Sequence, residues 1–172
     1  MHVGARTVIA ITATLAIALG AAGAAAAAPK GGDLQMILGP GGTPSVINSF
    51  QFGVGVGIST PGAGGGREIS KPSFSEITVT RATDPLSVEL LESIATGTAY
   101  ESVEIHIPAG PFVAAWCLSD VLLSGYSVSS GGSGSPSESL SLNYAGITQA
   151  VGTAFVTYDL ASGATSSESL CS

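Results

Sequence analysis

The sequence predicts a mainly β fold, an antiparallel β-barrel or sandwich with one packed α-helix. Apolar residues alternate with polar or small residues in several segments, and this period of two is typical of strands with one buried face. A single stretch, residues 84–97, has the spacing of an amphipathic helix instead. The connections are of hairpin length and no strand-helix-strand unit repeats, which excludes a doubly wound parallel sheet.

Residues 1–28 are expected to be an export signal that is removed from the mature protein. Arg6 precedes an uncharged apolar run over residues 8–22, and the alanines at 24–28 offer small residues for cleavage. A membrane anchor is the alternative, but the run is shorter than the roughly 20 apolar residues that a spanning helix needs. Cleavage after Ala28, or after Ala27, leaves residues 29–172 as a single domain.

The charge balance excludes two classes of partner. The chain has 5 Lys and Arg against 12 Asp and Glu, and its net charge of −7 becomes −8 once Arg6 is removed. Nucleic acids and anionic membranes both bind clustered Lys and Arg. We therefore expect neither as a partner of the mature chain, and the acidity favours solubility outside the cell.

Residues 46–58 are expected to form the first strand. From Phe50 on, the even positions are apolar and belong in the core, whereas Gly53, Gly55 and Gly57 line the opposite face. A glycine-lined face lets another backbone approach closely, as in a contact between subunits, or bends the strand at a barrel corner. Both interpretations stay open.

A Gly-rich loop follows at residues 60–70 and includes Gly64, Gly65, Gly66 and Arg67. It lacks the Gly-Lys-Ser/Thr ending and the following helix of a phosphate-binding loop, so we exclude nucleotide binding there. The loop is interpreted either as an arm that contacts another subunit or as a flexible connection.

The one expected helix begins at residue 84. Asp84 is a good capping residue and Pro85 suits the first helical position, while Gly97 ends the helix as a left-handed cap. Glu89 and Glu92 are expected to face water. The expected core-facing stripe, with the residues that flank it, comprises Val88, Leu91, Ala95, Leu90 and Ile94.

Further strands flank this helix. Residues 73–81 precede it, and residues 103–107 follow it with clear alternation. A turn at residues 108–111 leads into a long strand over residues 112–129. Two more strands are expected at 139–147 and 154–160.

Two ordered segments carry a family resemblance. Residues 119–147 contain DVLLSGYS, a Gly, Ser and Pro loop, and PSESLSLNY, while residues 71–97 contain KPSFSEITVTR before the helix. With FQFGVG at residues 50–55, they resemble the haemolysin-coregulated proteins (Hcp), the tube subunits of type VI secretion systems. The matching signature positions are Asp120, Val121, Leu122, Ser124, Tyr126, Ser127, Pro136, Glu138, Ser139, Ser141, Leu142, Asn143 and Tyr144.

The resemblance implies an Hcp-like β-barrel and assembly into hexameric rings. For the family it also implies a tube that carries effectors through its lumen, with the loop that corresponds to residues 60–70 reaching the neighbouring ring of a stack. The expected export signal departs from this pattern, because type VI tubes assemble in the cytoplasm.

The sequence offers little for catalysis. His106, the only histidine beyond residue 28, lies on the polar face of a strand, and Gly125-Tyr126-Ser127 lacks the final glycine of a nucleophile elbow. One histidine with two separated cysteines is too few for a typical zinc site. No metal and no cofactor is expected.

Two carboxylate pairs are candidates for a glycosidase, Glu101 with Glu104 and Asp120 with Glu138, but neither has an aromatic-rich setting. We expect Asp120 and Glu138 to lie at matching ends of the two signature strands. Their expected role there is to accept backbone amides at the loop closure.

Cys117 and Cys171 are the only cysteines. An exported chain meets an oxidising compartment, which favours a disulfide between them. The alternative is a buried free thiol at Cys117 with Cys171 fraying at the terminus.

These observations predict a secreted, non-enzymatic structural protein of the Hcp type that associates with itself into rings. Protein cargo or a host protein is a further expected partner. A monomeric secreted binding module on the same scaffold is the alternative, and a hydrolase that uses His106 or the carboxylate pairs ranks third. The candidate contacts between subunits are Gly53, Gly55, Gly57, Gly64, Gly65, Gly66 and Arg67.

Overall fold

The computed structural model describes residues 32–59, 66–132 and 134–171, so the expected export signal lies outside the described ranges. The fold is mainly β with one helix, and all strand pairs are antiparallel, which confirms the predicted fold class. The elements are β1 (Gln35–Leu38), β2 (Ser45–Val46), β3 (Ser49–Gln51), β4 (Val54–Gly55), β5 (Ile58–Ser59), β6 (Glu68–Ile69), β7 (Ser73–Phe74), β8 (Ile77–Ala82), α1 (Leu86–Thr96), β9 (Tyr100–Ala109), β10 (Phe112–Ser129), β11 (Ser137–Asn143), β12 (Gly146–Val151), β13 (Ala154–Asp159) and β14 (Ala164–Ser166).

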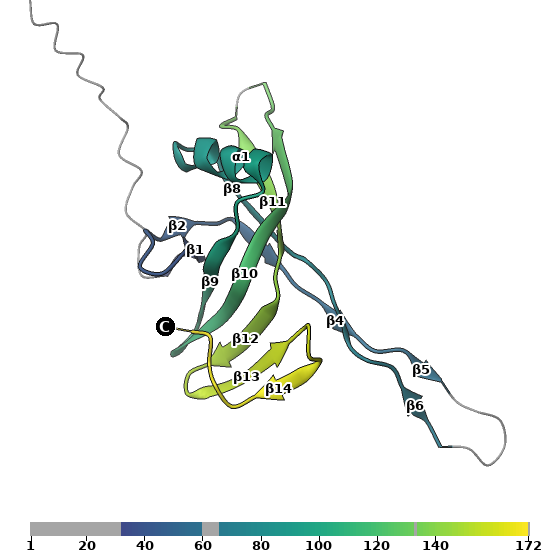
Figure 1. The fold of residues 1–172 in the computed structure, drawn as a ribbon. Coiled ribbons are helices and arrows are strands. Elements are labelled where there is room, and N and C mark those ends of the chain that lie inside the picture. Colours follow the sequence, from purple (N-terminus) through teal and green to yellow (C-terminus); the bar gives the residue numbers. More distant parts are fainter. Residues whose placement is uncertain (1–31, 60–65, 133, 172) are drawn as a thin grey trace, which may run out of the picture.

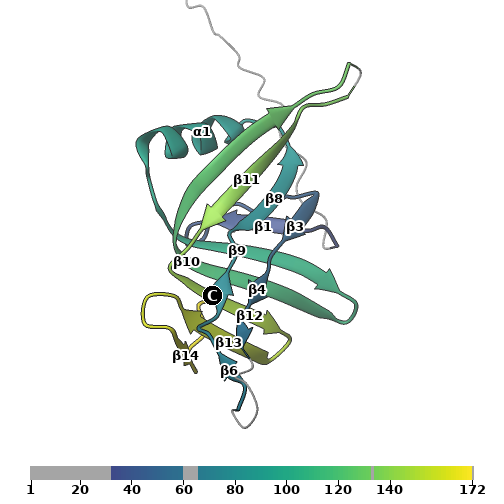
Figure 2. The same ribbon diagram turned by 90° about the vertical axis from the view of Figure 1, so that its right-hand side faces the viewer.

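The main sheet has 10 strands and runs in the order β14-β13-β12-β10-β11-β8-β3, with β9 joining β10 to β1 and β2. Figures 1 and 2 show how β10 runs through the whole body. Its first part pairs with β9 and β12, and its last part pairs with β11. The core lies between these two parts of the sheet, with α1 packed against β10.

The two signature strands are present as β10 and β11. The strand expected at residues 139–147 is divided, however, because β11 ends at Asn143 and β12 begins at Gly146. The antiparallel register pairs Leu122 with Asn143 and Val128 with Glu138. Asp120 and Glu138 therefore lie at opposite ends of the strand pair, and the prediction of matching ends was wrong.

The C-cap of α1 is as predicted, because Gly97 adopts a left-handed φ of 67°. At the other end the helix begins one residue later than predicted, with Pro85 at the N-cap and Leu86 as the first helical residue. Asp84 lies just before the cap, and its Oδ1 accepts a hydrogen bond from the Leu86 N–H at 2.8 Å. The predicted buried stripe is wrong, because Val88 is 70% exposed and Leu91 is 53% exposed. The helix instead packs through residues four apart, with Leu90 fully buried between Leu86 and Ile94. Ala95 is also exposed.

The expected strand at residues 46–58 is broken into four short pieces, β2 to β5. Phe50 and Phe52 pack against the core as predicted, but Val54, Val56 and Ile58 are exposed. The reason is that β4 pairs with β7 and β5 with β6 outside the main sheet, so within the described ranges no second layer covers them.

A buried ion pair joins β8 to β11. Arg81 Nη1 donates to Glu138 Oε1 at 2.7 Å, and the Tyr126 hydroxyl donates to Glu138 Oε2 at 3.0 Å. The other end of the same guanidinium contacts Asp84, which accepts a hydrogen bond at the start of α1. Arg81 and Glu138 are each 1% exposed. Glu138 therefore pairs with side chains, and not with the backbone amides that were expected.

Replacing Arg81 should test how much the fold depends on this pair. Arg81→Met leaves the Glu138 carboxylate buried without its cation, which costs about 3–5 kcal/mol of the free energy of unfolding. The double variant Arg81→Met/Glu138→Gln carries no buried charge, and its amide still accepts from Tyr126. We expect the double variant to be more stable than the single one in urea unfolding. Equal or greater loss in the double variant would contradict this account.

Candidate self-association surface

The most prominent surface feature is a two-stranded arm, defined here as residues 53–59 and 66–74. It is built by β4 paired with β7 and β5 paired with β6, with Val54 opposite Phe74 and Ile58 opposite Ile69. Figure 1 shows the arm leaving the body of the protein. An isolated hairpin of this kind is marginally stable in water.

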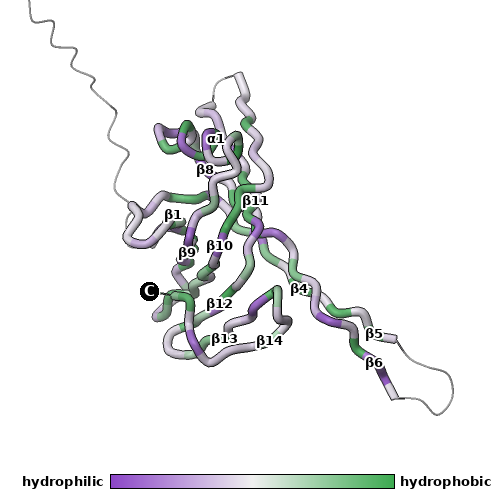
Figure 3. Tube along the Cα trace, in the orientation of Figure 1, coloured by the Kyte–Doolittle hydropathy of each residue, from purple (hydrophilic) through white to green (hydrophobic). Residues whose placement is uncertain are grey.

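One face of the arm is apolar and uncovered. The exposed fractions are 55% for Val54, 46% for Val56, 57% for Ile58 and 69% for Ile69. Figure 3 shows these apolar stretches along the arm, separated by polar residues. Apolar side chains that gather on a protruding segment mark a surface for contact with another molecule.

The other face carries the predicted glycines. The Gly53 N–H donates to Ser75 Oγ at 2.9 Å, and the Gly57 N–H donates to Ser70 Oγ at 2.7 Å. A Cβ placed on Gly55 would meet nothing within 4 Å. Gly66 and Arg67 are exposed, whereas Gly64 and Gly65 lie outside the described residues.

The base of the arm is anchored by aromatic rings. Phe74 stacks on Tyr158 of β13 with a centroid distance of 4.6 Å and lies 6.3 Å from Phe52. The Tyr144 hydroxyl donates to the Ser75 carbonyl at 2.8 Å, and burial raises the pKa of Tyr144 to about 12. This hydroxyl therefore remains a donor at all physiological pH values.

The described residues of the arm include Arg67, Glu68 and Lys71 and carry a net charge of +1, whereas the chain as a whole is acidic. Among the described residues, Arg67 and Lys71 on the arm are the exposed cations, since Arg81 is buried in its ion pair. An open groove of about 590 Å³ lies between the connection of β1 to β2 and the start of α1. Apolar and uncharged polar side chains line it, and its charged residues are the acids Asp84 and Glu89.

The candidate catalytic residues do not assemble into a reactive site. His106 Nε2 lies 3.0 Å from Glu104 Oε2, but Glu101 is exposed while Glu104 is buried, and Asp120 lies far along the strand pair from Glu138. Within the described ranges, no three His, Cys, Asp or Glu side chains gather in a way that suits a metal ion. None of the helices in these ranges is long and apolar enough to span a membrane.

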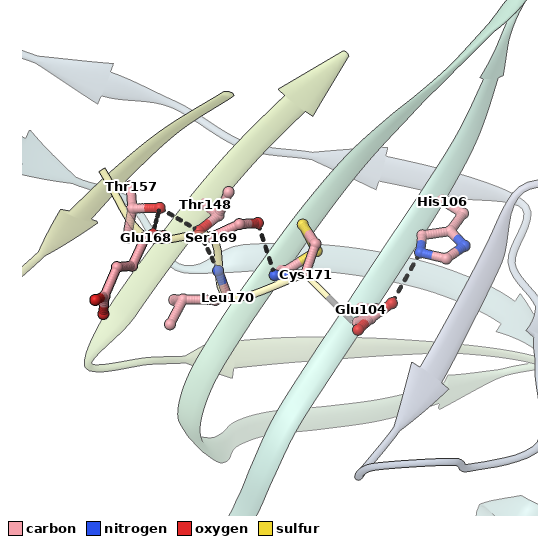
Figure 4. The surroundings of a disulfide bond; sticks show 9 residues. Glu104, His106, Thr148, Thr157, Glu168, Ser169, Leu170 and Cys171 are labelled. Carbon is pink, nitrogen blue, oxygen red and sulfur yellow. Dashed lines mark hydrogen bonds and ion pairs between the residues drawn. A yellow bond between two sulfur atoms is a disulfide. The ribbon is translucent and has the colours of Figure 1, made fainter. Parts of the chain in front are cut away.

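The predicted disulfide is present between Cys117 and Cys171, with 5.1 Å between the two Cα atoms. Figure 4 shows the C-terminal residues that lead to it. Sequence reasoning found this pair from the cysteine count. It missed the path of residues 164–171, which have no apolar periodicity that would indicate where they pack.

Comparison with known proteins identifies the family. Residues 44–151 match the family model described as "Type VI secretion system effector, Hcp". The chain belongs to this family. The Hcp match includes the arm, α1 and both signature strands, and it ends before β13. Among curated proteins, no sequence matches the chain significantly.

Solved structures agree with the Hcp fold. A structure described as a type six secretion system protein shares 19% identity, covers 78% of this chain and 99% of its own, and has a TM-score of 0.69. Hcp1 from Salmonella typhimurium shares 16% identity over 78% of this chain and 98% of its own, with a TM-score of 0.61. A type VI secretion system effector from Yersinia pestis shares 16% identity over 74% and 99%, with a TM-score of 0.59. At these identities the likeness shows the fold.

Removing the disulfide should destabilise the monomer. The two cysteines are separated by 54 positions, and closing a loop of this length stabilises a fold by about 4 kcal/mol in the chain-entropy model. We expect Cys171→Ser to lower the urea midpoint accordingly, with Ser167→Ala, at an exposed position of the same segment, as the control. Denatured but unreduced wild-type protein should show no reactive thiols, and two thiols per chain would contradict the bond.

Proposed function

We propose that this chain is a structural protein of the Hcp type that associates with further copies of itself, in rings of six as the family resemblance implies. It acts through surfaces and performs no catalysis. The observation that carries the proposal is the arm, whose apolar face is covered by no other part of the described chain. Such a face gains stability when a second copy buries it.

The contact is expected to be heterologous, because the arm and the surface that complements it are different parts of the molecule. The arm presents apolar side chains beside Arg67, Glu68 and Lys71, with a net charge of +1. The groove beside α1 presents apolar side chains beside Asp84 and Glu89. Opposite charge and shared apolar character favour this groove as the acceptor of the arm from a second copy. Heterologous contacts of this kind generate closed rings or open stacks.

The overall charge opposes association. The net charge of the chain, −7 in full and −8 once Arg6 is removed with residues 1–28, makes like subunits repel one another at low ionic strength. The local contact between arm and groove is attractive, but it involves fewer charges than the whole surface. We therefore expect association to strengthen as moderate salt is added.

A substitution on the open face of the arm tests self-association. Gly55→Arg adds a bulky charge where a second backbone would approach, and no atom of the same chain lies within 4 Å of the new Cβ. We expect light scattering to show smaller particles than for the wild type, with an unchanged circular dichroism spectrum. Gly131→Arg is the matched control, since its Cβ also meets nothing within 4 Å.

Charge reversal identifies the acceptor surface in the same experiment. Arg67→Glu should weaken association, and adding Glu89→Lys should restore it if these side chains meet. If wild-type protein is monomeric at high concentration and moderate salt, self-association is wrong. The monomeric secreted binding module then becomes the better account.

We also propose that the chain is exported and loses residues 1–28. The charged start, the apolar run and the alanine-rich boundary support this, and so does a disulfide that suits an oxidising compartment. The expected mass of the protein from culture supernatant is that of residues 29–172, or 28–172 for cleavage after Ala27. Retention of residues 1–22 in a membrane fraction would contradict export.

A further inference from the structure

One side of the sheet carries a polar row that is unexpectedly buried. The register places Glu104, Cys117, Thr148 and Thr157 opposite one another across β9, β10, β12 and β13. They share the face that points away from the core, because their neighbours in sequence, such as Leu118 and Ile147, belong to the core. Yet Thr148 is fully buried, and Thr157 is 5% exposed.

The residues that cover this row are 167–171, which we call the strap. Figure 4 shows the strap crossing from Thr157 over Thr148 to the disulfide. Thr157 Oγ1 donates to the Glu168 carbonyl at 2.6 Å, and the Leu170 N–H donates to Thr148 Oγ1 at 3.0 Å. The two threonine hydroxyls lie 2.6 Å apart.

These distances determine the direction of every hydrogen bond. The single hydroxyl hydrogen of Thr157 is used on the Glu168 carbonyl, so the hydroxyl of Thr148 must donate to Thr157. The Leu170 N–H donates to the Thr148 hydroxyl, this hydroxyl donates to Thr157, and the Thr157 hydroxyl donates to the Glu168 carbonyl. We call this chain of three hydrogen bonds the relay. The face binds one main-chain donor and one main-chain acceptor of the strap, two residues apart.

The side chains beside the row leave room for the strap. A Cβ on Gly146 would come within 3.3 Å of the Leu170 side chain and 2.6 Å of Ser119 Oγ. The absence of a side chain at Gly146 thus leaves the space in which the Leu170 side chain packs. Peptide-binding surfaces combine main-chain hydrogen bonds with pockets for individual side chains. This face of the sheet has both.

We propose that this face is a peptide-binding trough whose resident ligand is the strap, and that the disulfide controls access to it. The ligand class is an extended peptide that presents a main-chain carbonyl and, two residues later, the N–H of a leucine-sized residue. This proposal is independent of ring formation. The strap lies beyond residues 44–151, the range of the Hcp match.

Reduction opens the trough. A dithiol reductant supplies two electrons and two protons, the bond between the Cys117 and Cys171 sulfurs breaks, two S–H bonds form, and the reductant becomes a cyclic disulfide. Among the described residues, the strap is then held by its two hydrogen bonds to threonines and its leucine contact. A peptide at millimolar concentration can compete with this tethered segment, whose effective concentration is on the order of millimolar, whereas it cannot displace a covalently attached one.

The test uses the full chain and a fluorescent peptide that copies residues 164–171 with serine in place of Cys171. We expect saturable binding to the reduced protein and to Cys171→Ser, and no binding to the oxidised protein. Thr148→Val removes the relay and should weaken peptide binding by about 3- to 10-fold, the value of one net hydrogen bond. Thr153→Val, the same change at an exposed turn, should leave binding unaltered.

Thiol labelling provides a second measurement on the folded, reduced protein. Cys117 is 1% exposed under the closed strap, so its thiol should become reactive on reduction and become protected again when the peptide is added. A Cys117 thiol that stays unreactive after reduction would overturn the opening of the strap. Absence of peptide binding to both the reduced protein and Cys171→Ser, or equal binding to reduced and oxidised protein, would overturn the trough.

Hydrogen exchange covers the case in which the reduced chain unfolds. In the oxidised protein the Leu170 N–H should exchange slowly, and Thr148→Val should accelerate it by at least about 3-fold, because its acceptor is lost. An unchanged exchange rate would mean that the relay does not hold the strap, and the trough would then be wrong.

Discussion

The rest of the structure depends on β10 serving two parts of the sheet in succession. Core residues alternate along a strand, but in β10 they run Leu118, Val121, Leu123 and then Tyr126. The spacing changes at Asp120, whose φ is 49°, and again at Ser124, where the register to β11 shifts. At each irregularity the core-facing residues change from one set of alternate positions to the other. Apolar side chains of β10 therefore continue to point into the core as the sheet curves. A regular strand of this length would point half of its apolar residues at water.

This curvature explains why the arm has no cover of its own. The body closes around its core with β3 and β8 at one side, and the chain between them continues outward as β4 to β7. The aromatic contacts of Phe52 and Phe74 end at the base of the arm. Beyond that point the chain keeps its apolar alternation but has nothing to pack against. An apolar pattern that persists where the fold ends is evidence for a surface completed by another molecule.

The sequence predicted the positions of the helix and of most strands, but it predicted less well which of their faces are buried. The alternation in residues 103–107 and the residues that flank α1 are local signals, and both gave the right element. Alternation in residues 46–58 shows that one face is apolar, but it carries no information on whether that face is covered. The helix likewise has two apolar stripes, Val88 with Leu91 and Leu86 with Leu90, and only the position of the sheet decides which is buried. Glu138 was misjudged because its partner Arg81 is distant in sequence.

The strap and the arm meet at β13, which places neighbouring residues on opposite faces of the sheet. Thr157 binds the strap, while Tyr158 stacks on Phe74 at the base of the arm. β13 is paired with β12 along its length and with β14 on its other side. The strap adds a contact to β13 on the face opposite the arm. The proposed trough and the base of the arm are therefore supported by opposite faces of the same strand.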